Sequence, residues 1–107
     1  LFNLAFKDKF SFHYEYSIQK AKQTLLKNKY LFDLIIVDLE LAEETGEEFI
    51  RYLRSSKKFN FPILAFSAHR TRGNALLKSG QVDAFASKPI SYKTLETMIS
   101  DLMKDET

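Results

Sequence analysis

The sequence has no cysteine, and only three glycines and two prolines occur among its 107 residues. The lack of cysteine excludes disulfides and thiolate metal sites, and two isolated histidines, His13 and His69, cannot form a histidine-rich zinc site. With so little glycine and proline, no linker or low-complexity tract interrupts the chain. We therefore interpret residues 1–107 as a single domain.

Charge of neither sign dominates, and long apolar runs are also lacking. Sixteen Lys and Arg residues are balanced by fourteen Asp and Glu residues, which leaves a net charge of +2, and the two signs alternate along the chain. This balance argues against a charge-driven partner such as a nucleic acid or an anionic membrane. The longest aliphatic run, Leu34 to Val37, is far shorter than the roughly 18 residues that a membrane-spanning helix needs. We expect a soluble, cytoplasmic protein.

Short apolar segments alternate with amphipathic segments along the chain. Strands are predicted at residues 10–16, 34–37, 63–66 and 84–87. Helices are predicted at residues 17–28, around Gly46 with an end near Ser55, at residues 74–79 and at residues 92–103. Ser17 and Ser91 are the expected N-caps of the first and last of these helices, and Gly80 is the expected residue after the third. The alternation predicts an α/β fold with a parallel sheet.

Three polar residues end three of the predicted strands. They are Asp38, Ser67 and Lys88. Ligands of open parallel sheets bind at the carboxyl ends of the strands, so these side chains form the candidate site. An Asp carboxylate can attack phosphorus, while a hydroxyl and an ammonium can bind the oxygens of the transferred group. The chemistry on offer is the capture of a phosphoryl group.

The segments around these residues resemble a known family. They are residues 32–41, with Gly46 eight residues after Asp38, residues 62–68 and residues 85–89. In this order they resemble the receiver domain of two-component response regulators, over about residues 10–103. The resemblance implies a flavodoxin-like, doubly wound parallel sheet of five strands in the order 2-1-3-4-5, with helices on both faces.

By this resemblance, Asp38 would be the phosphoacceptor for a histidine kinase or a phosphotransfer protein. Ser67 would be the hydroxyl that moves onto the bound phosphoryl group, and Lys88 would be its ion partner. Phe85 would be the aromatic switch, and the Lys88–Pro89 peptide bond would be cis. The chain would be a switch and not an enzyme, since its only reactions would be its own phosphorylation and dephosphorylation.

The resemblance also implies residues that adjust and transmit the signal. Glu40 and His69 would flank the phosphoryl group and tune its lifetime. The last two helices and the strand over residues 84–87 would form the signalling face, toward an output domain or a second copy of the chain. Two interpretations are open for Arg70 and Arg72, which would either steer a phosphorylated partner or keep the loop soluble, and we interpret them as solvated loop residues.

A Mg²⁺ site is implied as well, with Asp38 and the backbone carbonyl of Glu40 as two of its ligands. Its remaining acidic ligands would lie at the end of the first strand, roughly forty residues before Asp38, and that strand is not in the sequence. Residues 1–8 are predicted to end a helix. Asp8 is the alternative candidate for the missing acidic ligand, but it lies too close to the strand over residues 10–16 for a crossover helix between them. Because Leu1 is not an initiator methionine, we expect an upstream segment that carries the missing strand and the acidic pair, or a neighbouring chain that supplies this segment by exchange.

Other functions remain open. Leu41-Ala42 stand where receivers usually have Met-Pro, and with the missing acids this motivates a phosphorylation-silent docking or dimerisation module. A phosphatase of the haloacid-dehalogenase kind would need a second Asp where Glu40 stands, and it would need room for a cap domain. A flavodoxin-type FMN carrier would need a phosphate-binding loop rich in hydroxyls and glycine, which follows none of the strands.

Overall fold

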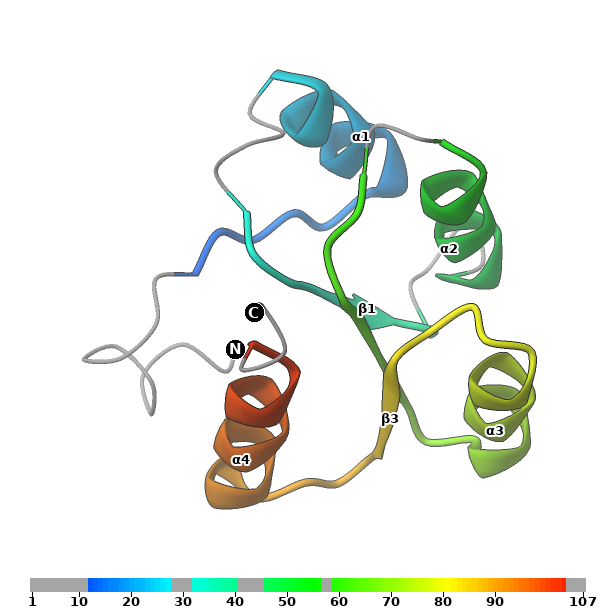
Figure 1. Ribbon diagram of the computed structural model, residues 1–107, viewed down its shortest axis with the longest axis vertical. Coiled ribbons are helices and arrows are strands. Elements are labelled where there is room, and N and C mark those ends of the chain that lie inside the picture. The colour runs from blue at the N-terminus through cyan, green and yellow to red at the C-terminus, as the bar shows by residue number, and fades with distance from the viewer. Residues whose placement is uncertain (1–11, 28–31, 41–45, 57–58, 104–107) are drawn as a thin grey trace.

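The computed structural model describes residues 12–27, 32–40, 46–56 and 59–103, and Figure 1 shows their elements around a parallel sheet. Three predictions lie outside these residues. They concern the helix end over residues 1–8, the role of Asp8 and the loop after Glu40. No helix in the described part of the chain is long and apolar enough to cross a membrane.

The sheet contains three described strands, and all are parallel. The strands are β1 (Ile35–Asp38), β2 (Ile63–Ser67) and β3 (Ala84–Ser87), in the order β1-β2-β3. Their register aligns Asp38 with Phe66 and Ser67 with Ser87. Every residue of β2 is buried, as its continuous apolar sequence predicts for a strand that is covered on both faces. The predicted parallel sheet is therefore confirmed for these three strands.

Four helices in the described ranges pack on the two faces of this sheet. They are α1 (Ile18–Lys27), α2 (Gly46–Ser55), α3 (Arg70–Lys78) and α4 (Tyr92–Met103). One core joins the apolar faces of α1, α2 and α3 to side chains of the sheet such as Val37 and Ile63. The other core joins Leu95 and Ile99 of α4 to Leu64 on the opposite face. Figure 1 shows α4 across the sheet from α2 and α3. The predicted helices on both faces are thus present.

Local capping fixes where several helices begin and end. The Ser17 hydroxyl accepts the backbone N–H of Lys20, and the Ser91 hydroxyl accepts the backbone N–H of Thr94. Gly80 follows α3 with a φ of +79°, in the left-handed region that favours glycine. These three residues have the capping roles that the sequence predicts.

The start of α3 differs from the prediction. The helix begins at Arg70, four residues before the expected start at Asn74. Its first turn has no large apolar residue, and its buried positions are Gly73 and Leu76. A Cβ atom built on Gly73 would lie 2.1 Å from carbons of the Phe85 ring. This turn can therefore pack against Phe85 only because Gly73 has no side chain. Apolar periodicity cannot detect such a contact.

The strand predicted over residues 10–16 does not form in its described part, because residues 12–15 lie outside any helix or strand. The aromatic residues of this segment still contribute to packing, and Phe12 lies against the core beneath α4. A strand needs a hydrogen-bonded neighbour, and the described sheet ends at β1. The alternating apolar residues therefore indicate a segment that packs against the core but does not form a strand in its described part.

Candidate functional site

The three residues predicted for the site meet at one edge of the sheet. Asp38 ends β1, Ser67 ends β2, and Lys88 directly follows β3. Because the strands are parallel, their carboxyl ends lie side by side. The Lys88 ammonium lies 2.9 Å from Oδ1 and 3.0 Å from Oδ2 of Asp38. The structure thus joins a carboxylate and an ammonium that are 50 residues apart in the sequence.

Lys88 is the central cation of this edge. Besides Asp38 it contacts Oε1 of Glu40 at 3.2 Å, and its ammonium lies 5.2 Å from the centroid of the Phe66 ring, within cation–π range. Burial lowers the pKa of Lys88, but the hydrogen bonds to Asp38 and Glu40 outweigh the effect of burial. The pKa of Lys88 is therefore raised above its ordinary value. Lys88 therefore stays protonated and can neutralise an anion at the site.

The Glu40 carboxylate contacts residues at the ends of β2 and β3. Its backbone N–H donates to Oδ1 of Asp38 at 2.9 Å, which fixes the turn after β1. Its carboxylate accepts the Ser67 hydroxyl at 2.5 Å and the Ala68 backbone N–H at 2.9 Å. Burial raises the pKa of Glu40, but the hydrogen bonds from Ser67, Ala68 and Lys88 outweigh burial and lower the pKa to about 2. At neutral pH this carboxylate is an anion that contacts Ser67, Ala68 and Lys88 at the strand ends.

Ser67 is fully buried, and its hydroxyl has partners on two sides. It donates to Glu40 and accepts the backbone N–H of His69 at 2.9 Å. The His69 side chain itself is exposed at the start of α3, where it makes no capping hydrogen bond. Of His69, the backbone is therefore the part that the structure places in contact with the site residues.

The structure also adds a residue pair that sequence reasoning missed. Arg72 donates through Nε and Nη2 to the two carboxylate oxygens of Glu47 at 2.7 and 2.6 Å. It further donates to the carbonyl oxygen of Leu39 at 2.9 Å and to Oε2 of Glu40 at 3.3 Å. Hydrogen bonds from Arg72 lower the pKa of Glu47 against the effect of burial. One guanidinium thus connects α3, the start of α2 and the turn after β1.

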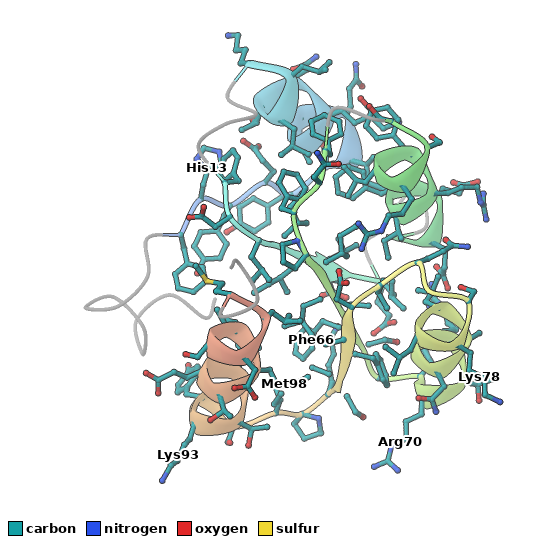
Figure 2. All side chains as sticks on the ribbon, viewed as in Figure 1. His13, Phe66, Arg70, Lys78, Lys93 and Met98 are labelled. Atoms are coloured by element: carbon teal, nitrogen blue, oxygen red, sulfur yellow. The ribbon has the colours of Figure 1, made fainter. Side chains whose placement is uncertain are left out.

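Interpreting Arg72 as a solvated loop residue is therefore wrong. That interpretation followed from starting the helix at Asn74, which left Arg72 outside any element. The signal for its role is its place in the first turn of α3, because this turn begins next to the strand end that carries Ser67. Figure 2 shows Arg70 and Lys78, also on α3, pointing away from the sheet.

Phe85 and Pro89 complete the set of predicted residues. Phe85 is partly buried and packs against Gly73 of α3, so this ring connects β3 to the helix that begins at the site. The Lys88–Pro89 peptide bond is cis. Both residues lie within four positions of Lys88 along the chain.

The oxygen atoms at this edge match the ligands that Mg²⁺ prefers, namely carboxylates and carbonyls. The described residues contain no group of three or more His, Cys, Asp or Glu side chains that could hold a metal ion. Asp38 ends β1 and supplies a carboxylate at the strand end, and the Glu40 carboxylate, two residues further along, accepts hydrogen bonds from Ser67 and Ala68. This part of the chain could therefore supply only some of the ligands of a metal centre.

Comparisons with known proteins identify the family of the chain. The sequence profile of a family described as "Response regulator receiver domain" matches residues 3–100. The chain is 30% identical over 89 residues to Histidine kinase 1 of Arabidopsis thaliana, an alignment that covers 78% of this chain and 7% of that protein. It is 33% identical over 73 residues to the polar-differentiation response regulator DivK of Brucella ovis, which covers 65% of this chain and 59% of DivK. The chain thus spans less than two thirds of the length of either relative.

Solved structures show the same fold. The receiver domain of Francisella response regulator 1452 matches with a TM-score of 0.82 over 99% of this chain and 87% of that chain. The sequence identity is 23%, so this likeness concerns the fold alone.

Proposed function

Because the chain belongs to the response regulator receiver domain family, whose members are signalling domains that interact with histidine kinases or phosphotransfer proteins, we propose that it accepts a phosphoryl group on Asp38. The observation that carries this proposal is the contact of the Lys88 ammonium with both carboxylate oxygens of Asp38 at the carboxyl edge of the sheet. A phosphorylated Asp38 would place its new negative charge beside this cation. In this role the chain is a phosphoacceptor switch and not an enzyme with a separate substrate.

The proposed step is a phosphoryl transfer from a phosphohistidine of the donor protein. An Asp38 carboxylate oxygen attacks the phosphorus, an O–P bond forms, and the P–N bond to the histidine breaks. The electron pair of that bond stays on the imidazole nitrogen, which takes up a proton. Lys88 would bind one phosphoryl oxygen, and the Ser67 hydroxyl and the Ala68 N–H would bind another.

Mg²⁺ is part of the proposal, with Asp38 and the backbone carbonyl of Glu40 among its ligands. When bound, the ion would neutralise charge on the phosphoryl oxygens. Its further acidic ligands are expected outside the described residues. The five-stranded order 2-1-3-4-5 belongs to the same proposal, since it places a further strand on the edge of β1 that faces away from β2.

The signal would leave the site through α3, β3 and α4. Ser67 lies three residues before the start of α3 at Arg70, and Phe85 of β3 packs against Gly73 of α3. A change at the strand ends could therefore move this face, which we propose as the surface for an output domain or a second copy of the chain. We place the domain in the cytoplasm, where histidine kinases and phosphotransfer proteins would donate to it.

The test is intact mass spectrometry after incubation with acetyl phosphate and Mg²⁺. We expect one phosphoryl adduct on the wild-type protein, none on Asp38→Asn, and none on the wild type with EDTA in place of Mg²⁺. Asp33→Asn is the matched control, because Asp33 is an exposed carboxylate five residues upstream, and this variant should label like the wild type. Labelling of Asp38→Asn, or equal labelling without Mg²⁺, would contradict the proposal.

One observation favours a second candidate, a phosphorylation-silent docking module. The donors that would bind the phosphoryl oxygens already bind the Glu40 carboxylate. A folded chain that stays unlabelled both with acetyl phosphate and with a phosphorylated histidine kinase, while it still binds that kinase, would establish this second function.

A further inference from the structure

Three hydrogen-bond donors at the strand ends converge on a single carboxylate. They are the Ser67 hydroxyl, the Ala68 backbone N–H and the Lys88 ammonium, which we call the donor cluster. The donor cluster contacts the Glu40 carboxylate at 2.5, 2.9 and 3.2 Å respectively. The first two donors come from β2 and the residue after it, and the third follows β3. This convergence depends on the tertiary structure, because Glu40 lies 27 residues from Ser67.

A donor cluster of this kind binds anionic oxygens in general and does not distinguish strongly between a carboxylate and a phosphoryl group. A hydroxyl, a backbone N–H and an ammonium can bind phosphoryl oxygens as well as carboxylate oxygens. Two anions cannot share these three donors without strong repulsion at such short range. Whatever binds the donor cluster next must therefore displace Glu40.

We propose that Glu40 is a resident anion, a side chain of the protein itself that occupies the donor cluster and competes with a phosphoryl group at Asp38. The inference deepens the proposed function and rests on it for its biological meaning. The competition itself is a property of the donor cluster, and it can be measured in a protein that cannot be phosphorylated.

The surroundings of Glu40 allow its carboxylate to leave without unfolding the turn. The backbone of Glu40 is fixed separately, through the hydrogen bond from its N–H to Asp38. A second cation, Arg72, already lies 3.3 Å from Oε2 of Glu40 and is itself held by Glu47. A rotation of the Glu40 side chain toward Arg72 would free Ser67, Ala68 and Lys88 while it keeps the carboxylate beside a positive charge.

This arrangement has a consequence for the switch. In the unphosphorylated protein the Ser67 hydroxyl is already directed at an anion beside Asp38. Phosphorylation would exchange one anion for another at Ser67, and the larger displacement would fall on Glu40 and its contact with Arg72. Glu40 would then act as a positioning residue that sets how readily the site accepts a phosphoryl group.

The test measures the binding of inorganic phosphate to the donor cluster in an Asp38→Asn background, where neither phosphorylation nor Mg²⁺ at Asp38 takes part. The readout is the NMR shift of the Ala68 amide during a phosphate titration. We expect Asp38→Asn/Glu40→Ala to bind phosphate about tenfold more tightly than Asp38→Asn alone. Asp38→Asn/Glu40→Gln, which keeps the shape without the charge, should lie between them.

The matched control is Asp38→Asn/Glu48→Gln, which removes one negative charge from an exposed position of α2 and should bind phosphate like Asp38→Asn. The Ala68 amide should also shift in the Glu40 variants before any phosphate is added, since it loses a charged acceptor. Equal phosphate affinity in all four proteins, including no measurable binding to any of them, would overturn the inference. That result would leave the proposed phosphorylation of Asp38 untouched, because its test uses the unmodified site.

Discussion

Arg72 connects three segments of the chain through one side chain. Both of its carboxylate partners and the carbonyl of Leu39 lie within hydrogen-bond distance of its planar guanidinium. The pairing with Glu47 is bidentate and half-buried, a geometry in which an ion pair contributes more than isolated surface pairs do. At the scale of single residues, Arg72 therefore organises the site without contacting Asp38 in a hydrogen bond.

A double-mutant cycle on Arg72 and Glu47 measures this pairing. We expect Arg72→Met and Glu47→Gln each to lower the free energy of unfolding, with a coupling of about 1 kcal/mol between them. Arg72→Lys should not restore the loss, because an ammonium cannot make the two parallel hydrogen bonds. Urea denaturation of the four proteins gives the coupling, and strictly additive losses would show that the pair makes no net contribution.

Helix α3 and strand β3 pack closely because Gly73 of α3 has no side chain at the point where it meets Phe85 of β3. Gly73 is buried where α3 crosses Phe85, and the ring occupies the space that a Cβ atom would need. A glycine inside a helix ordinarily lowers helix stability by about 1 kcal/mol relative to alanine. Close packing between the helix and the strand offsets that cost here.

Gly73→Ala is therefore expected to destabilise the protein although alanine is the better helix former. The clash with Phe85 should cost about 1–3 kcal/mol, which exceeds the gain in helix propensity. Asn74→Ala, at the next and exposed position of α3, is the control and should be neutral or slightly stabilising. Thermal unfolding followed by circular dichroism compares the two.

A smaller side chain in place of the Phe85 ring should relieve the clash that Gly73→Ala creates. The double variant Gly73→Ala/Phe85→Leu is expected to be more stable than the sum of the two single losses predicts. Additive losses would mean that the helix shifts to accommodate the new methyl group and that the contact with Phe85 is not what requires glycine.

At the scale of the whole molecule, the charges at the edge of the sheet connect function with stability. The hydrogen bonds formed on folding lower the pKa of several carboxylates, and Glu40 is the clearest case, with its pKa lowered to about 2. Its stabilising contribution is complete above its ordinary pKa of about 4.5 and is lost as the pH falls toward 2. The difference corresponds to roughly 3 kcal/mol at most.

The lowered pKa of Glu40 predicts how the free energy of unfolding changes at acid pH. Between pH 5 and pH 2 the wild-type protein should lose more free energy of unfolding than Glu40→Gln, which has no proton to take up at this position. Urea denaturation across this range, without added metal, measures both proteins. Parallel pH profiles would show that folding leaves the affinity of Glu40 for protons unchanged.

The order of the described helices and strands, and the three polar residues at the strand ends, can be predicted from local sequence patterns. Hydrophobic periodicity and caps such as Ser17 and Ser91 are local, so they can be detected without a fold. Asp38, Ser67 and Lys88 could also be predicted to meet, because parallel strands bring their carboxyl ends to one edge. The contacts around these three residues could not be predicted in this way, because they form only when the elements pack together. Residues far apart in the sequence place the Glu40 carboxylate on the donor cluster, Arg72 beside Glu47 and Phe85 against Gly73. Such contacts depend on distances between elements, which no local pattern encodes.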